Sequence, residues 1–176
     1  MDVPSYLLGK NAGGGGGGDS EYLNTEVTQD TNNTRHIQLL KKSFDVYVAD
    51  TVVSLQNAFQ YSDQKILPKI HCNNNVKYMQ NMFAGNSFIT SIDISGMNAN
   101  EIVNASSAFL NCTSLRFLDM RNISFTASAS INGIIGGAAS NGPPSNCEII
   151  VKSDVEKQLL LAQRPDLTNI KTVAEL

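Results

Sequence analysis

The same spacing of hydrophobic residues recurs several times along the chain. Four residue pairs mark it, at intervals of about 25 residues, and we call them the marker pairs. The marker pairs are Ala58-Phe59, Met82-Phe83, Ala108-Phe109 and Ile134-Ile135. Before each pair, apolar or small residues occupy positions i, i+3, i+6 and i+7, which line one face of a helix of about two turns. We therefore expect a short helix in each unit, over 52–59, 76–83, 102–109 and 128–135.

A second hydrophobic pattern follows each pair and indicates a strand. Ile89-x-x-Ile92-x-Ile94 returns as Leu115-x-x-Leu118-x-Met120, and apolar residues two positions apart are typical of a strand with one buried face. One such unit cannot bury its own apolar face, whereas stacked units bury a continuous one. The expected core is Ile92, Ile94, Leu118 and Met120 with Met82, Phe83, Phe109 and Leu115.

A helix, a turn and a strand in every repeat of roughly 20–30 residues are typical of leucine-rich repeats. The sequence after the Phe of a marker pair is more specific: Phe109 is followed by Cys112 and by "LDM" at 118–120, and Phe83 by Asn86 and by "IDI" at 92–94. This pattern resembles the BspA-like leucine-rich repeats of bacterial surface, mycoplasma and phage-encoded proteins, and the resemblance covers roughly 52–151. It implies a short α/β solenoid of parallel strands alternating with short helices.

The ends of the chain differ from the repeats. "SFDVYVAD" at 43–50 alternates as a strand does, so the repeat domain is expected over 43–151, after an irregular lead-in at 19–42. Over 152–176 we expect a helical cap. Ser153 or Asp154 begins its helix, Pro165 ends it, and "LTNIKTV" adds a final edge strand.

The segment 1–18 stands apart from the rest of the chain. Six glycines at 13–18 make a flexible tether with a reach of roughly 13 Å. The head before them holds Tyr6, Leu7 and Leu8, and is either a disordered terminus or a docking peptide that orders on a partner. The opening lacks the basic and apolar regions of a secretory signal. It resembles the N-terminus of phage and prophage structural proteins, which implies a virion protein assembled in the host cytoplasm.

Composition narrows the possible partners. Charged residues make up 16% of the chain and the net charge is −3, so neither a nucleic-acid stripe nor a polybasic membrane patch is expected. No apolar stretch reaches the roughly 20 residues needed for a membrane-spanning helix. The three cysteines, Cys72, Cys112 and Cys147, are odd in number and widely spaced. We expect them to be reduced, buried thiols.

Strand alternation predicts a candidate binding surface. If Ile92, Ile94, Leu118 and Met120 point inward, their neighbours on the strands face outward. The expected outward residues are Lys69, His71, Asn73, Ser91, Asp93, Ser95, Phe117, Asp119 and Arg121. Phe117 is the unusual one, because an outward aromatic is either functional or covered by the Tyr78 region or a neighbouring subunit.

No catalytic constellation emerges from the sequence, and no cofactor is expected. His71 and Cys72 point to opposite faces of a strand, and the paired carboxylates Asp93 and Asp119 are explained by the repeat better than by a catalytic dyad. We therefore expect a non-enzymatic, virion-associated binding module. Its partners would be other virion proteins through residues 1–12, a host surface protein or polysaccharide, and a second copy of the chain. The alternatives are a bacterial surface adhesin and an intracellular protein-binding scaffold.

Overall fold

The computed structural model describes residues 23–25, 46–48, 52–61, 69–72, 74–137 and 141–176. The expected docking peptide and tether lie outside these ranges, and so do Tyr6, Leu7 and Leu8. Asn73 and most of the expected irregular lead-in also lie outside them. The described part of the lead-in, Leu23–Thr25, is not irregular but forms a strand.

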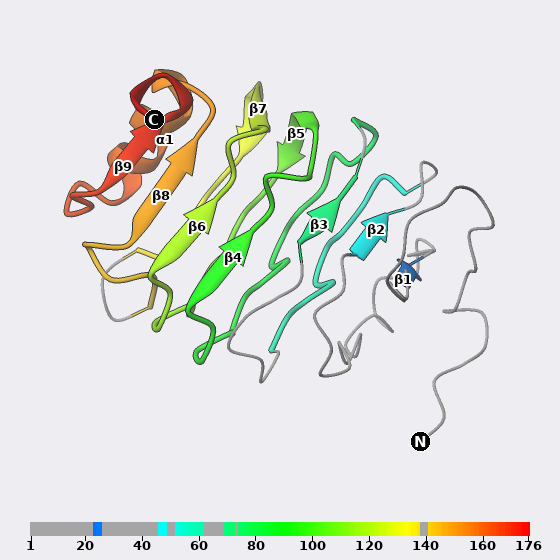
Figure 1. Ribbon diagram of the computed structural model, residues 1–176, viewed down its shortest axis with the longest axis horizontal. Helices are drawn as coiled ribbons and strands as arrows, with labels where there is room; N and C mark the ends of the chain where they lie inside the picture. Colours follow the sequence, from blue (N-terminus) through cyan, green and yellow to red (C-terminus); the bar gives the residue numbers. More distant parts are fainter. Residues whose placement is uncertain (1–22, 26–45, 49–51, 62–68, 73, 138–140) are drawn as a thin grey trace, which may run out of the picture.

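Parallel strands form the framework of the molecule (Figure 1). Every strand pair in the described ranges is parallel, and the strands form three sheets with the orders β1-β2-β3, β4-β6-β8-β9 and β5-β7. This confirms the expected α/β class with parallel strands. The strands are β1 Leu23–Thr25, β2 Val46–Val48, β3 Ile70–His71, β4 Ser91–Asp93, β5 Ala99–Asn104, β6 Phe117–Asp119, β7 Ile123–Ser130, β8 Glu148–Val151 and β9 Ile170–Thr172.

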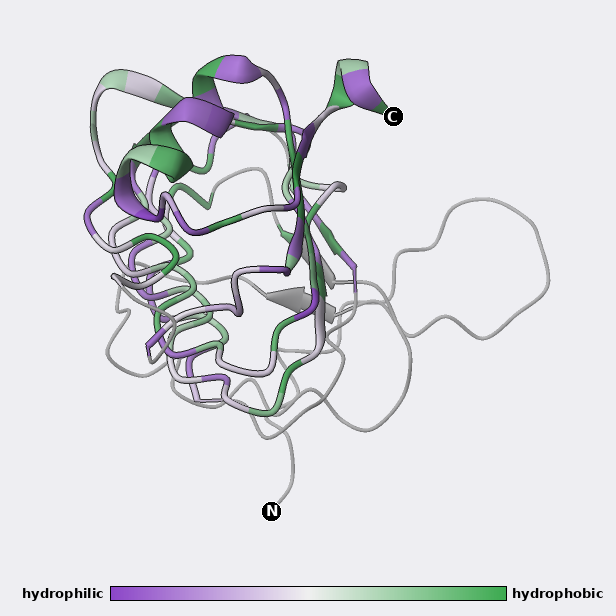
Figure 2. Cartoon of the chain, turned by 90° about the vertical axis from the view of Figure 1, so that its left-hand side faces the viewer, coloured by the Kyte–Doolittle hydropathy of each residue, from purple (hydrophilic) through white to green (hydrophobic). Residues whose placement is uncertain are grey.

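Strand pairing fixes the length of chain in each turn of the stack. Ser91 pairs with Phe117 and Ala99 pairs with Ile123, so the partners are separated by one repeat in the sequence. Tyr78 pairs with Ser54 on one side and with Asn104 on the other, at similar intervals. We call each such circuit of the chain a coil. Seen along the stack, the coils overlie one another (Figure 2).

The expected short helices are wrong. Residues 56–61, 80–85 and 106–111 form turns, and residues 102–104 and 128–130 belong to β5 and β7. Their backbone groups bond to the next coil. The N–H of Phe59 donates to Met82 O (2.8 Å), that of Phe83 to Ala108 O (2.8 Å), and that of Phe109 to Ile134 O (2.7 Å). The apolar positions still face the core, but through a turn and not through a helix.

Left-handed residues explain why the turns cannot be helical. Asn57, Asn81, Ser107 and Gly133 have φ of 59°, 51°, 57° and 61°, and each precedes one of the marker pairs. A right-handed helix does not accommodate a positive φ, and only Gly and, less readily, Asn or Asp visit this region at low cost. A positive φ at the same position of four coils therefore turns the chain there.

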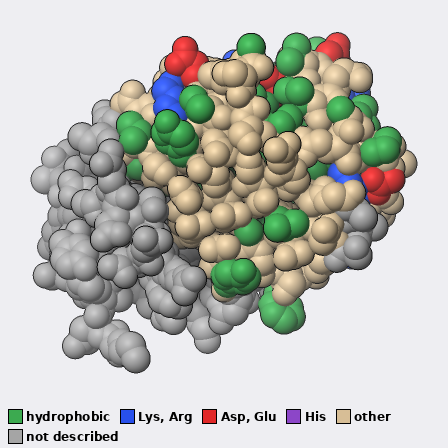
Figure 3. Space-filling model, turned by 180° about the vertical axis from the view of Figure 1, so that it is seen from behind, with side chains coloured by type: hydrophobic (Ala, Val, Ile, Leu, Met, Phe, Trp, Pro, Cys, Tyr) green, Lys and Arg blue, Asp and Glu red, His purple; other side chains and the backbone are tan. Residues whose placement is uncertain are grey.

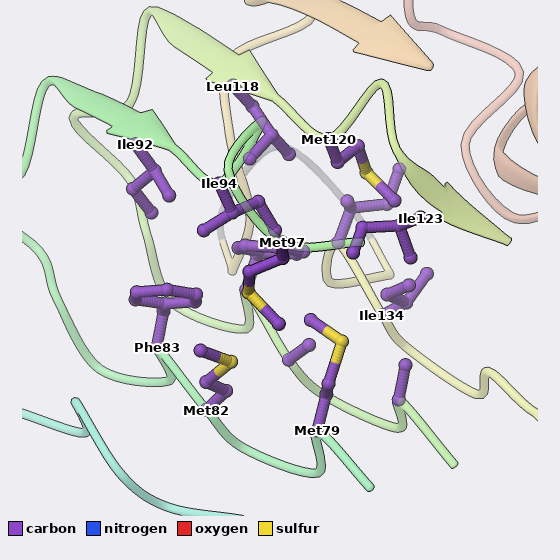
Figure 4. Close-up of a cluster of buried hydrophobic side chains, with 14 of the residues drawn as sticks. Met79, Met82, Phe83, Ile92, Ile94, Met97, Leu118, Met120, Ile123 and Ile134 are labelled. Atoms are coloured by element: carbon purple, nitrogen blue, oxygen red, sulfur yellow. The ribbon is translucent and has the colours of Figure 1, made fainter. Parts of the chain in front are cut away.

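The core lies where the hydrophobic pattern places it (Figure 4). All eight expected core residues are buried. One side of the core is a column of three phenylalanine rings. Phe59 stacks on Phe83 and Phe83 on Phe109, with centroids 5.4 Å apart in both pairs. Stacked aromatic pairs add about 0.5–1.5 kcal/mol beyond the area they bury, so the column ties adjacent coils together.

The C-terminal segment forms the expected helix and final edge strand. Helix α1, the only α-helix in the described ranges, spans Asp154–Gln163 and ends shortly before Pro165. Ser153 caps it by accepting the Val155 N–H and by donating to the carboxylate of Glu156 (2.6 Å). Strand β9 then joins the edge of the four-stranded sheet, and a short 3-10 helix, η3 (Val173–Glu175), follows it.

A buried arginine connects this cap to the last coil. Arg164 is fully buried, and its guanidinium donates to the carbonyl oxygens of Ile135 (3.4 Å) and Pro143 (3.1 Å). It also donates to both carboxylate oxygens of Asp166 at 2.7 Å, and this hydrogen bonding holds the pKa of Asp166 below its usual value. The arginine thus provides donors to carbonyl groups at the end of the stack.

Candidate binding surface

The outward face of the β4-β6-β8-β9 sheet carries most of the predicted site. Ile92 and Leu118 are buried in the core, while Ser91, Asp93 and Phe117 are partly exposed. Strand register aligns Ser91, Phe117 and Glu148 in one line across the sheet. It aligns Asp93, Asp119 and Ile150 in a second line. We call this surface the strand face.

Asp119 corrects the prediction of an exposed carboxylate. It is only 3% exposed, although it pairs in register with the partly exposed Asp93. Arg121 folds back onto it. The Arg121 Nε lies 2.9 Å from each carboxylate oxygen, and its backbone N–H also donates to Asp119 (3.2 Å). Hydrogen bonding to Asp119 raises the pKa of Arg121. A ligand at this point would meet the arginine and not the aspartate.

Asp93 remains accessible and is held in its charged form. Burial alone would raise its pKa. Hydrogen bonds from the side chain and the backbone N–H of Ser95 (2.9 Å for the N–H) and the positive charges of Lys69 and Arg121 outweigh this effect and lower the pKa. The Lys69 Nζ lies 3.7 Å from Asp93. Lys69 and Asp93, both predicted to face outward, therefore meet across adjacent coils.

His71 lies on β3, which belongs to a different sheet from β4 and β6. It pairs with Tyr47 of β2, and the next residue, Cys72, pairs with Met97. Its ring packs over Gly96, where an added Cβ would lie 2.7 Å from the His71 Nδ1. The predicted outward residues therefore share one sheet only from β4 onward. Lys69, just before β3, reaches that sheet through its ion pair with Asp93.

Phe117 is half-buried on the strand face. The ring contacts in the described ranges run through Phe59, Phe83 and Phe109, and none joins Phe117 to Tyr78. Tyr78 pairs through its backbone with Ser54 and Asn104. Because Phe117 is only partly buried, its ring is partly available to a partner.

Two further residues of the strand face were missed in the sequence. Lys171 of β9 donates to Glu148 of β8 at 2.8 Å, and both side chains are partly exposed. The alternation in "CEIIV" and "NIKTV" places both residues outward and could have predicted them. The face therefore carries three ion pairs on successive strands: Lys69–Asp93, Arg121–Asp119 and Lys171–Glu148.

The three cysteine thiols have raised pKa values, which disfavours the reactive thiolate form. Burial raises the pKa of Cys72, Cys112 and Cys147 to about 12, although the side chain of Cys72 is only half-buried. The described residues contain no cluster of three or more His, Cys, Asp or Glu side chains suited to a metal ion. No helix in these same ranges combines the length and apolar character required to cross a membrane.

Comparisons with protein-family models, with curated proteins and with solved structures give no match to this chain.

Proposed function

We propose that the chain is a short leucine-rich-repeat solenoid of the BspA-like type. The coil length of about 25 residues and the parallel strands support this proposal. So does the third position after Phe83 and after Phe109, where the family pattern has Asn or Cys. Asn86 and Cys112 occupy it here. Asn86 donates to the carbonyl oxygens of Phe59 and Phe83, and Cys112 donates to that of Phe83.

We propose further that this solenoid is the non-enzymatic binding module of a phage virion. The observation that carries a binding role is Phe117, a half-buried aromatic flanked by ion pairs on a rigid sheet face. Aromatic residues with a partly apolar environment are typical anchors of protein interfaces. The virion role is supported by the opening segment, in which an apolar head precedes a glycine tether.

Mass spectrometry of purified phage particles tests the virion role. The full chain should be found in the particles. A variant that lacks residues 1–12 should fold normally and be absent from them, because Tyr6, Leu7 and Leu8 would no longer be buried in a partner. Each buried Leu side chain contributes roughly 1.5–3 kcal/mol before the cost of ordering the peptide. Equal incorporation of both chains would contradict the docking role of the head.

The same preparation separates the alternatives. A bacterial surface adhesin would be recovered from the host envelope, and an intracellular scaffold from the soluble fraction bound to a host protein. Either result, with particles that lack the chain, would overturn the virion proposal.

The strand face can be tested separately by host adsorption. Phe117→Ala together with Arg121→Ala should reduce adsorption of particles to host cells. Val155→Ala, an exposed change on α1, is the control and should leave adsorption unchanged. Equal adsorption of both variants would show that the strand face does not contact the host.

A further inference from the structure

A second polar surface lies where β5 and β7 begin. Asn74, Asn100, Ser124 and Lys152 occupy four successive coils and are joined by hydrogen bonds. The Asn100 N–H donates to Asn74 Oδ1 (2.9 Å), the Ser124 hydroxyl to Asn100 O (3.1 Å), and Lys152 Nζ to Asn100 Oδ1 (2.7 Å).

A parallel line of amides runs beside it. Asn98 accepts a hydrogen bond from Asn100 Nδ2 at 3.0 Å, and Asn122, one coil later, donates from Nδ2 to Ser95 O at 2.7 Å. Asn98 and Asn122 are both exposed. We call the six residues Asn74, Asn98, Asn100, Ser124, Asn122 and Lys152 the amide ladder.

Charge is sparse on this surface. Two nearby charged residues, Lys77 before β5 and Glu101 on it, neutralise each other across one coil at 2.7 Å. Figure 3 shows a similar character on the back of the molecule, where most described side chains carry no charge. The ammonium of Lys152 is the one charge among the six residues of the amide ladder. Their electrostatic potential is therefore too weak to select a strongly charged ligand.

The chemistry and spacing of the ladder match a sugar chain. Amide side chains donate and accept at once, as sugar hydroxyl groups do. Neighbouring strands lie about 4.8 Å apart, so the ladder repeats at about the length of one sugar ring in an extended polymer. The side chains are already oriented by hydrogen bonds, to one another and, for Asn122, to the Ser95 carbonyl oxygen, which lowers the entropy lost on binding.

We propose that the amide ladder binds a linear, uncharged polysaccharide that lies along the stack and contacts successive coils. The inference rests on the binding role proposed above, names the class of ligand, and assigns it to a surface other than the strand face. Exposed Asn98 and Asn122 make direct contacts with the sugar hydroxyl groups. Asn100 holds Asn98 and, with Ser124, Lys152 in place, and the Ser95 carbonyl oxygen holds Asn122.

Native gel electrophoresis through immobilised polysaccharide tests the proposal on the full chain. The probes are dextran, hydroxyethyl cellulose and galactomannan as uncharged polymers, with hyaluronate as an anionic one. At least one uncharged polymer should retard the chain. Asn98→Ala combined with Asn122→Ala should weaken that retardation by about tenfold or more in apparent dissociation constant. Asn146→Ala, an exposed amide in the loop before β8, is the matched control and should behave as the unaltered chain.

Three results would overturn the proposal: no retardation by any of the uncharged polymers, retardation by hyaluronate alone, or equal retardation of the double variant and the unaltered chain. Thermal unfolding of each variant, followed by circular dichroism, checks that the fold is retained. Particle incorporation does not depend on the ladder, so a failed gel experiment with normal incorporation would reject the ladder and leave the virion role standing.

Discussion

Asn86 and Cys112 occupy equivalent positions in successive coils, and both donate to the carbonyl oxygen of Phe83, Asn86 from Nδ2 at 2.7 Å and Cys112 from Sγ at 3.3 Å. Both side chains are fully buried. Asn86 also reaches back to the carbonyl oxygen of Phe59, at 2.7 Å. Buried carbonyl groups require donors, so this position is restricted to small residues that can donate inward.

Replacing Asn86 should therefore destabilise the stack more than replacing Cys112. Asn86→Ala leaves the Phe59 carbonyl without this donor and should lower the free energy of unfolding by about 1–3 kcal/mol. Cys112→Ala removes a weaker donor and should cost less. Asn86→Cys should fall between wild type and Asn86→Ala, because it copies the arrangement of the next coil. Urea unfolding measures all three, and a greater loss for Cys112→Ala would contradict the donor role of Asn86.

Leu118 tests the predicted core. Its side chain on β6 is fully buried in the core, and Leu118→Ala should lower the free energy of unfolding by about 2–5 kcal/mol. Val103→Ala on β5 is the control, because Val103 is exposed, and its change should stay within about 0.5 kcal/mol. An unchanged thermal midpoint for Leu118→Ala would refute the register of the core.

Gly85 lies in a turn that excludes a side chain. Its φ is +79°, and an added Cβ would lie 2.2 Å from the Tyr61 Cδ1. Gly85→Ala should cost about 1–2 kcal/mol for the left-handed backbone, and more for the clash with the tyrosine ring. Adding Tyr61→Ala should recover only the part due to the clash. Denaturant unfolding of the double variant shows this coupling, and purely additive losses would mean that the ring does not contact this turn.

The buried thiols predict how stability depends on alkaline pH. Burial raises the pKa of Cys112 and Cys147 from 9.0 to about 12. Below pH 9 the thiols are protonated in both the folded and the unfolded chain, so stability is unaffected. As pH rises from about 9 toward 12, only the unfolded chain loses these protons, and folding becomes less favourable.

Two measurements check the thiols. A thiol reagent at pH 8 should modify the native chain far more slowly than the urea-unfolded chain, since the thiolate fraction is about a thousandfold lower when the pKa rises by three units. Unfolding between pH 9 and 12 should show a smaller loss of stability in Cys112→Ala/Cys147→Ala than in the unaltered chain. Rapid modification of Cys112 and Cys147 in the native chain would contradict their burial.

The sequence predicts the core of this fold better than its local geometry. Apolar residues at i, i+3, i+6 and i+7 face one side in a helix, but a sharp turn paired to its neighbours brings the same positions inward. The distinguishing signal was the recurrence of Asn57, Asn81 and Gly133 immediately before the marker pairs. Asn and Gly at a fixed spacing indicate left-handed turns, and they would have excluded the helices.

The candidate site was predictable only in part. Alternation places Asp93 and Phe117 outward, and it would also have placed Glu148 and Lys171 there. It cannot reveal the burial of Asp119, which depends on the side-chain conformation of Arg121. Contacts between distant segments, such as Arg164 with Ile135, likewise follow from the way the last loop folds and not from any local pattern.

Every proposal above requires that adjacent coils lie one repeat apart, and a disulfide tests this register most directly. The Ser106 and Ser130 hydroxyl oxygens lie 2.8 Å apart in neighbouring coils, so Ser106→Cys combined with Ser130→Cys should form a disulfide under mild oxidation while the buried native thiols stay reduced. Closing a loop of this length should stabilise the chain by about 3 kcal/mol. Peptide mapping should find a bond between residues 106 and 130 and none between residues 106 and 128 in the control pair Ser106→Cys/Ser128→Cys. A bond in the control pair, or none in either, would contradict the stacked-coil account.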